Sequence, residues 1–297
     1  MSVPAAHRSC LSVPGSTPRM LAKAAGLEAD EIVIDLEDAV TVAAKDEARA
    51  LVADSLRGTD WGERHVSVRV NAVGTPWCHL DLLALAELER GPDSVVVPKV
   101  ESAADLTFVE RLLDGAEAHN GSRTAPIGLQ ALVESAAGLG RVAEIAACGG
   151  RLEALVLGYA DLAASLGRDT DAEPGLWDSA REALLLAARA HGLRAIDGPY
   201  LGTGANERLL TSAQRGKAAG FDGKWAIHPS QLEILNEVFS PSPAEVEWAR
   251  SVIAALGEAE AQGAGAVELD GRMLDEALRA AALRLLDRAE TAPGPSA

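Results

Sequence analysis

The sequence predicts a (β/α)8 barrel, the TIM-barrel class of α/β fold, followed by a C-terminal helical extension. Short β-branched runs alternate with Ala- and Leu-rich segments of helical spacing through about 240 of the 297 residues. The β-branched runs number eight, whereas an open doubly wound sheet usually has fewer strands. No Gly-rich phosphate-binding turn follows the first run, which also disfavours an open dinucleotide-binding sheet.

The eight predicted strands share enrichment in Val, Ile and Leu, and each is bounded by turn-forming or helical sequence. They cover residues 10–14, 31–36, 65–70, 94–98, 127–133, 152–157, 193–196 and 223–227. The helical segments between them cover residues 18–27, 43–56, 80–90, 104–118, 177–191 and 206–219. We therefore assign a catalytic barrel domain to residues 1–240.

The pattern changes after the eighth strand. Two long helical stretches, residues 242–261 and 273–291, flank the Gly-containing segment 263–271. We assign residues 241–297 to a C-terminal helical lid. Both helices carry apolar rows that a completed barrel does not need, so we expect the lid to pack on a neighbouring subunit of a homotrimer or hexamer.

Composition excludes several classes of partner. The formal net charge is −17, from 27 Lys and Arg against 44 Asp and Glu, which argues against binding to nucleic acid or to an anionic membrane. No apolar run approaches the roughly 20 residues of a membrane span, and the N-terminus lacks the apolar stretch of a secretory signal. The three Cys are irregularly spaced, without a zinc or disulfide pattern. We expect a cytoplasmic enzyme with reduced thiols.

Two carboxylates identify a candidate metal site. Glu134 and Asp161 each follow an apolar run that reads as a buried strand. An isolated anion beside an apolar core is costly unless it is paired or binds a metal. Two such anions from neighbouring strands therefore suggest a divalent cation between them.

Other polar side chains also gather where strands end, which in a barrel is the end that carries the chemistry. Random placement would scatter these groups over both ends of the barrel. They are Glu37 and Asp38, Arg69 and Asn71, Lys99, Asp197 and His228.

The motifs that contain these residues resemble the citrate lyase β-subunit-like and malyl-CoA lyase group of the HpcH/HpaI aldolase/citrate lyase family. The resemblance is colinear from residue 8 to about residue 290. It implies a Mg²⁺-dependent barrel that makes or breaks a C–C bond between an acyl-CoA and a 2-oxo acid. The matching segments are Leu11-Ser-Val-Pro-Gly-Ser16, Ile34-Asp-Leu-Glu-Asp-Ala-Val40, Val68-Arg-Val-Asn71, Val97-Pro-Lys-Val-Glu-Ser102, Leu132-Val-Glu-Ser135, Leu157-Gly-Tyr-Ala-Asp-Leu162 and Gly220-Phe-Asp-Gly-Lys-Trp-Ala-Ile-His-Pro-Ser-Gln231.

The resemblance implies that Glu134 and Asp161 ligate Mg²⁺, in agreement with the reading of the two carboxylates. Mg²⁺ keeps several waters, so two carboxylates, waters and a bidentate 2-oxo acid would complete its shell. Glu37 and Asp38 would hold metal-bound water, with a helix cap as the alternative for Asp38.

Three cationic residues are the substrate-binding candidates. Arg69 would grip the carboxylate of the 2-oxo acid with its planar guanidinium, unless it is tied to a neighbouring acid in the barrel mouth. Lys99 could meet the thioester or the phosphates of CoA, or form a salt bridge to Glu134 or Asp161. Arg19, in the first βα loop, is a candidate for CoA contact.

The lid carries one further catalytic candidate. Gly271-Arg-Met-Leu-Asp275 is similar to a Gly-x-Met-x-Asp segment of the family whose Asp enters the active site of an adjacent subunit and exchanges the α-proton of the acyl-CoA. The family usually has Pro shortly after this Asp, whereas Glu276 and Ala277 follow here. Asp275 also suits a helix N-terminus, so a purely structural role is the alternative.

We therefore predict a Mg²⁺-dependent lyase acting on a 3-hydroxyacyl-CoA of the malyl-CoA, citramalyl-CoA or citryl-CoA type. The alternatives are a thioesterase or malate-synthase-like activity, a metal-dependent aldolase on free hydroxy-oxo acids, and a non-catalytic subunit. The sequence does not decide which 2-oxo acid is used.

Overall fold

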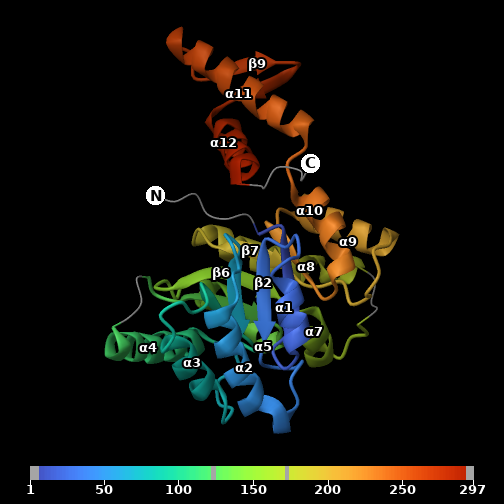
Figure 1. Ribbon diagram of the computed structural model, residues 1–297. Coiled ribbons are helices and arrows are strands. Elements are labelled where there is room, and N and C mark those ends of the chain that lie inside the picture. Colours follow the sequence, from blue (N-terminus) through green and yellow to red (C-terminus); the bar gives the residue numbers. More distant parts are fainter. Residues whose placement is uncertain (1–6, 122–124, 171–173, 292–297) are drawn as a thin grey trace. The chain divides into compact units, whose positions relative to one another are not determined.

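In the computed structural model, eight parallel strands close into a barrel in sequence order (Figure 1), which confirms the predicted architecture. The structure describes residues 7–121, 125–170 and 174–291. The parallel pairing of β1 with β8 closes the barrel. The strands are β1 (Ser9–Pro14), β2 (Glu31–Asp35), β3 (His65–Arg69), β4 (Ser94–Val97), β5 (Gly128–Val133), β6 (Leu152–Leu157), β7 (Arg194–Asp197) and β8 (Gly223–Ala226).

Helices follow the strands and surround the barrel (Figure 1). Four short α-helices of five to eight residues lie outside the predicted helical segments, because so few residues carry little periodicity: α5 (Ala136–Gly140), α6 (Val142–Ala146), α7 (Tyr159–Leu166) and α10 (Leu232–Phe239). The helical elements are α1 (Pro18–Ala24), η1 (Val42–Ala44), α2 (Lys45–Gly58), α3 (Cys78–Ala86), α4 (Ala103–Asn120), α5 (Ala136–Gly140), α6 (Val142–Ala146), α7 (Tyr159–Leu166), η2 (Pro174–Trp177), α8 (Asp178–Ala190), α9 (Glu207–Ala219), η3 (Pro229–Gln231) and α10 (Leu232–Phe239).

The interior of the barrel is layered. Seven strands each contribute one buried side chain to a central apolar layer, namely Cys10, Val33, Val96, Leu132, Val156, Ile196 and Trp225. Below it, towards the strand N-termini, the buried Glu31 carboxylate accepts hydrogen bonds from Ser67 (2.6 Å) and Gln130 (2.7 Å), and it pairs with His7 (2.9 Å). These partners offset the cost of burying the charge. The opposite end of the strands carries the candidate site.

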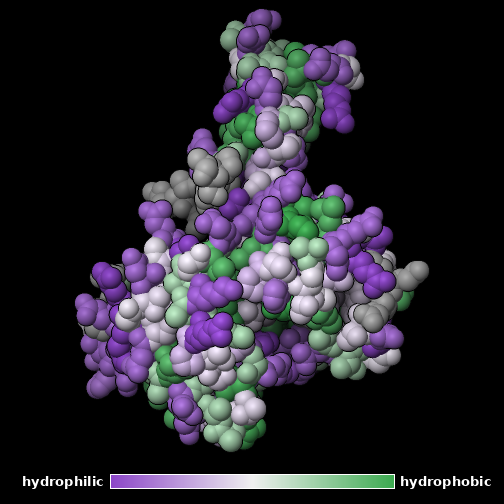
Figure 2. All heavy atoms as spheres, turned by 45° about the vertical axis from the view of Figure 1, so that its right-hand side comes forward, coloured by the Kyte–Doolittle hydropathy of each residue, from purple (hydrophilic) through white to green (hydrophobic). Residues whose placement is uncertain are grey.

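The surface of the protein is mixed in polarity. Figure 2 shows a face on which hydrophilic side chains alternate with smaller hydrophobic areas. No helix in the described part of the chain combines the length and the apolar character needed to cross a bilayer.

The chain divides into two compact units, the barrel over residues 7–236 and a C-terminal unit from residue 237 onward. The C-terminal unit contains α11 (Pro243–Ala261), the antiparallel strands β9 (Val267–Leu269) and β10 (Arg272–Leu274), and α12 (Glu276–Thr291). The helix predicted to begin at residue 273 begins instead at Glu276. Asp270 (φ 49°) and Gly271 (φ 76°) form the hairpin turn, as expected for an Asp-Gly pair at left-handed positions.

The apolar rows of α11 and α12 have a partner within their own unit. Ala249, Val252 and Leu256 of α11 form a buried cluster with Leu274 and Ala282. Part of the apolar surface that led us to expect packing on another subunit is therefore already buried within the C-terminal unit. Some apolar side chains of the unit are still exposed, including Met273 (68%) and Leu283 (52%).

Candidate active site

Arg69 ends β3 and forms the centre of an ion-pair network at the C-terminal end of the strands. Its Nε and Nη2 atoms donate to the two carboxylate oxygens of buried Asp35, at 2.8 and 2.6 Å. Nη1 lies 3.0 Å from Oε2 of Glu37, and the guanidinium stands over the ring of Trp225, 5.8 Å from its centroid. Burial alone would lower the pKa of Arg69, but the hydrogen bonds to Asp35 raise it, so the cation is fixed. Arg69 is thus paired with neighbouring acids, Asp35 and Glu37, which is the alternative that the sequence left open for this residue.

Asp35, which ends β2, was missed as a site residue. It bonds Arg69 and also accepts from the backbone N–H groups of Glu37 (2.8 Å) and Ala39 (3.1 Å). It therefore shapes the βα loop that carries Glu37 and Asp38. The available signal was the alternation of β2, which places Asp35 on the same interior side as Val33.

Lys99 contacts three carboxylates at the barrel mouth. Its ammonium contacts Oε1 of Glu37 and lies 3.6 Å from Asp38, whereas its backbone N–H donates to Oε1 of Glu134 at 2.9 Å. The expected salt bridge to Glu134 or Asp161 is thus replaced by one to Glu37. Lys99 has a left-handed backbone (φ 53°), which is uncommon for a residue with a side chain and often marks a functional constraint.

Glu37 and Asp38 differ in environment. Glu37 is buried, and burial raises its pKa despite the opposing charge of Arg69. Its Oε2 atom accepts no hydrogen bond from the described residues. The side chain of Asp38 is half exposed (56%) and lies 3.8 Å from Arg69. Asp38 does not cap a helix, because the N-cap of η1 is Thr41.

Glu134 directly follows β5 and is 3% exposed. Burial raises its pKa to about 8, and the charges of Glu37 and Asp161 contribute to the increase. The negative charges of Glu37, Glu134 and Asp161 thus repel one another. Arg69 and the N–H group of Lys99 offset only part of this effect on the pKa of Glu134.

Asp161 does not end the sixth strand, as the sequence predicted, but lies beyond it. The strand β6 ends at Leu157, and Asp161 is in the first turn of α7. Gly158 makes room for the side chain of Glu134, since a Cβ at this position would lie 2.6 Å from Cβ of Glu134. The Leu-Gly-Tyr-Ala-Asp motif therefore needs glycine for close packing against Glu134.

The remaining predicted residues have varied placements. Arg19 is exposed in the first turn of α1. Asp197 ends β7, but its carboxylate binds Lys224 (2.6 Å) and Tyr159 (2.5 Å) and belongs to a buried network. His228 caps η3 and accepts from the N–H of Ser230 (3.2 Å), consistent with a structural histidine.

Asp275 lies in the C-terminal unit at the N-terminus of α12. Its Oδ1 atom accepts from the N–H groups of Ala277 (3.0 Å) and Leu278 (3.2 Å). The structure thus assigns a capping role to this exposed carboxylate, and the catalytic role stays a prediction.

The residues at the barrel mouth fit a Mg²⁺ ion. Mg²⁺ prefers oxygen ligands, keeps waters, and is commonly held by one or two carboxylates, the number that Glu134 and Asp161 provide. A cation would relieve the repulsion that raises the pKa of Glu134. A second ligand set among the described residues is His7, Cys10 and Glu31. That Glu31 carboxylate is already bonded by Ser67, Gln130 and His7, so we do not assign an ion there.

Comparison with known proteins agrees with this geometry. The family profile described as HpcH/HpaI aldolase/citrate lyase matches residues 8–229, three quarters of the chain. The chain belongs to the HpcH/HpaI aldolase/citrate lyase family. This membership places the carboxylate and arginine network in a barrel family of lyases and aldolases.

Three proteins similar to this chain illustrate the degree of similarity. An L-malyl-CoA/β-methylmalyl-CoA lyase of Cereibacter sphaeroides is 39% identical over 91% of this chain and 90% of the lyase. A (3S)-malyl-CoA thioesterase of the same species is 43% identical, over 95% of this chain and 94% of the thioesterase. The crystal structure of CitE from Mycobacterium tuberculosis in complex with magnesium, acetoacetate and coenzyme A is 34% identical. It matches with a TM-score of 0.78 over 96% of this chain and 98% of CitE.

Proposed function

We propose that the protein is a Mg²⁺-dependent carbon–carbon lyase that splits a 3-hydroxyacyl-CoA, such as malyl-CoA, citramalyl-CoA or citryl-CoA, into an acyl-CoA and a 2-oxo acid. The observation that carries the proposal is the convergence of Glu134, Asp161 and Glu37 with a fixed Arg69 at the mouth of the barrel. The similarity to a malyl-CoA lyase and to a magnesium, acetoacetate and CoA complex supports the substrate class.

Each residue has a proposed task. Glu134 and Asp161 hold the ion, which when bound supplies positive charge at the oxygens where negative charge develops. Arg69 orients the carboxylate of the 2-oxo acid through the Nη1 and Nη2 hydrogens that its Asp35 contacts leave available. Lys99 holds Glu37 beside Arg69. Arg19 is the proposed contact for CoA.

The proton steps need a group at each end of the broken bond. In cleavage, a base takes the hydroxyl proton as the C–C bond breaks, the bond electrons pass to the α-carbon of the thioester, and that carbon then takes a proton. We assign protonation at that carbon to Asp275, supplied by a neighbouring chain of a homotrimer or hexamer. The exposed position of Asp275 in the C-terminal unit is compatible with such a supply.

A cytoplasmic location is part of the proposal. It rests on the acidic composition and on Cys10, Cys78 and Cys148, which are all free thiols.

The second candidate is a thioesterase, favoured by the 43% identity to a (3S)-malyl-CoA thioesterase. A lyase releases an acyl-CoA and a 2-oxo acid, whereas a thioesterase releases free CoA and a hydroxy acid. Product analysis with malyl-CoA and citramalyl-CoA separates the two activities.

The direct test measures lyase turnover with and without Mg²⁺, and the condensation of acetyl-CoA or propionyl-CoA with glyoxylate, pyruvate or oxaloacetate. We expect Mg²⁺-dependent turnover in wild type and none in Glu134→Gln. Glu87→Gln, which alters an exposed carboxylate at the end of α3, is the matched control and should stay active. Full activity after removal of Mg²⁺ with EDTA would contradict the metal assignment.

A further inference from the structure

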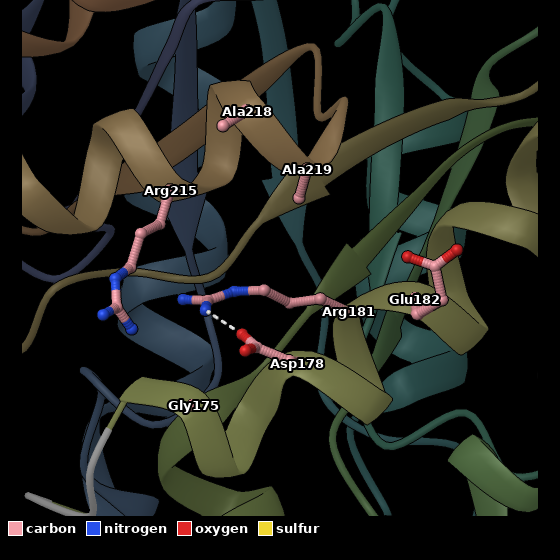
Figure 3. A pocket seen from close by; sticks show the side chains of 7 residues that line it. All are labelled: Gly175, Asp178, Arg181, Glu182, Arg215, Ala218 and Ala219. Atoms are coloured by element: carbon pink, nitrogen blue, oxygen red, sulfur yellow. Dashed lines mark hydrogen bonds and ion pairs between the residues drawn. The ribbon is translucent and has the colours of Figure 1, made fainter.

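Outside the candidate active site, a pocket of about 560 Å³ lies between η2, α8 and α9 (Figure 3). Its charged lining residues are Asp178, Arg181, Glu182 and Arg215, and Asp178 pairs with Arg181 at 3.3 Å. The charges of this lining balance, so it has no excess of either sign to attract a charged ligand. The buried side chain of Lys45, in contrast, acts on a loop of the candidate active site.

Lys45 begins α2, and only 6% of its surface is exposed. An ammonium group is costly to bury unless its donors are bonded. Its Nζ atom donates to the carbonyl oxygens of Leu36 and Glu37, at 2.7 Å in each case, and lies 5.6 Å from the centroid of the Trp77 ring. Both hydrogen bonds therefore tie α2 to the main chain of the loop that carries Glu37.

The two peptide groups that flank Glu37 are held by side chains of opposite charge. The peptide before Glu37 is bonded at both ends, since Lys45 binds its carbonyl oxygen and Asp35 accepts from its N–H at 2.8 Å. The peptide after Glu37 is bonded to Lys45 through its carbonyl oxygen. Because each peptide group is planar, holding both of them fixes the φ and ψ angles of Glu37 and the direction of its Cα–Cβ bond.

The position of the Glu37 carboxylate depends on this direction. Its Oε1 atom contacts the ammonium of Lys99, and its Oε2 atom lies 3.0 Å from Nη1 of Arg69. Oε2 accepts no hydrogen bond from the described residues, so this oxygen is available to a metal-bound water. A rotation of the Glu37 backbone would displace it relative to both cations.

We propose that Lys45 is a positioning residue of the Mg²⁺ site, which holds the loop after β2 in the conformation that lets Glu37 bind metal-bound water. The inference rests on the proposed function, in which Glu37 belongs to that site. Both hydrogen bonds of Lys45 go to the main chain, so it acts through Glu37 and not on the reacting atoms. Loss of an outer partner of a metal site typically lowers metal affinity about 10- to 100-fold, which is a measurable change.

A double-mutant cycle tests the proposal by calorimetry of Mg²⁺ binding to the full chain. Lys45→Met removes a positive charge as well as two hydrogen bonds, and the loss of charge alone would tighten Mg²⁺ binding equally in wild type and in Glu37→Gln. An effect that acts through Glu37 is instead absent from the Glu37→Gln variant. We therefore expect Lys45→Met to weaken Mg²⁺ binding about tenfold in wild type relative to its effect in Glu37→Gln.

Amide hydrogen exchange of the Mg²⁺-free chain reports on the loop directly. The N–H groups of Glu37 and Ala39, which donate to Asp35, should exchange faster in Lys45→Met. Lys23→Met alters an exposed lysine at the end of α1 and should match wild type in both measurements. Lys45→Gln replaces Lys45→Met if the latter folds poorly, because its end is polar but its shorter side chain cannot reach both carbonyl oxygens. It should show the same coupling to Glu37→Gln.

A purely structural lysine would stabilise the fold while the two substitutions acted independently on Mg²⁺ affinity. Independent effects in the cycle, or unchanged exchange at Glu37 and Ala39, would overturn the proposal. Absence of Mg²⁺ binding in wild type would overturn it together with the metal assignment. Independent effects alongside Mg²⁺-dependent lyase turnover would leave the proposed function standing. Coupling in the cycle without lyase turnover would reject the proposed function and support the positioning role of Lys45.

Discussion

The buried carboxylate of Glu134 should make the stability of the metal-free protein fall as the pH rises. An unfolded Glu134 loses its proton near pH 4.5, whereas burial and neighbouring charges raise its pKa in the folded protein to about 8. Between these values the folded state binds more protons than the unfolded state. The free energy of unfolding must therefore decrease with rising pH through this window.

The magnitude follows from the difference of about 3.5 pH units between 4.5 and 8. At about 1.36 kcal/mol per unit, complete ionisation above pH 8 would remove at most about 5 kcal/mol. Glu134→Gln cannot ionise, and its amide oxygen can still accept the hydrogen bond from the Lys99 N–H. We expect this variant to be more stable than wild type by about 2–4 kcal/mol at pH 7.5 without Mg²⁺.

Urea unfolding of EDTA-treated protein between pH 5 and about 8 measures this effect in wild type, Glu134→Gln and the control Glu87→Gln. Saturating Mg²⁺ should restore stability to wild type at the upper end of this range, but not to Glu134→Gln, because a ligand that binds only the folded state stabilises it. If the free energy of unfolding had the same pH dependence in wild type and Glu134→Gln, the reasoning that Glu134 has a raised pKa in the folded protein would be refuted.

Three further outcomes are expected. Arg69→Lys should raise KM for the 2-oxo acid and lower kcat, because an ammonium cannot form the paired hydrogen bonds of a guanidinium to a carboxylate. Steady-state kinetics should show kcat/KM reduced roughly tenfold or more. Unaltered kinetics would leave Arg69 with a structural role. Arg69→Met should lower the free energy of unfolding by about 3–5 kcal/mol, since it leaves buried Asp35 unpaired; a loss below about 1 kcal/mol in urea titration would show that this pair is unimportant for stability. Inactive Asp275→Asn and Glu134→Gln chains should regain partial activity when mixed and refolded, as some sites receive both intact groups. A monomer in sedimentation analysis, or no recovery despite subunit exchange, would contradict a shared site.

Much of the barrel was predictable because hydrophobic runs and turn residues act locally. Each of the eight predicted strands lies within about two residues of its observed bounds, for instance β6 at Leu152–Leu157. The β9–β10 hairpin was not predicted, although Asp270-Gly271 between β-rich triplets is a recognised signal. The helical spacing of the surrounding residues obscured it.

The candidate site was predictable in its members but not in their pairing. Strand ends identify Glu37, Arg69, Lys99 and Glu134 from the sequence, since parallel strands bring these ends together. The partner of each side chain depends on the backbone of the loops. The left-handed conformation of Lys99 turns its N–H to Glu134 while its ammonium contacts Glu37, and no spacing rule indicates this.

The apolar layer at the centre of the barrel has a consequence for the order of events. Its buried side chains, including Leu132 and Trp225, block passage between the two ends of the strands. Both reactants must therefore enter and leave through the same opening. If the 2-oxo acid binds at Arg69 as proposed, it would lie deeper in the opening than the thioester, so in condensation it should bind first, and in cleavage it should leave last. Product-inhibition patterns would reveal this ordered mechanism, and random-order patterns would contradict it.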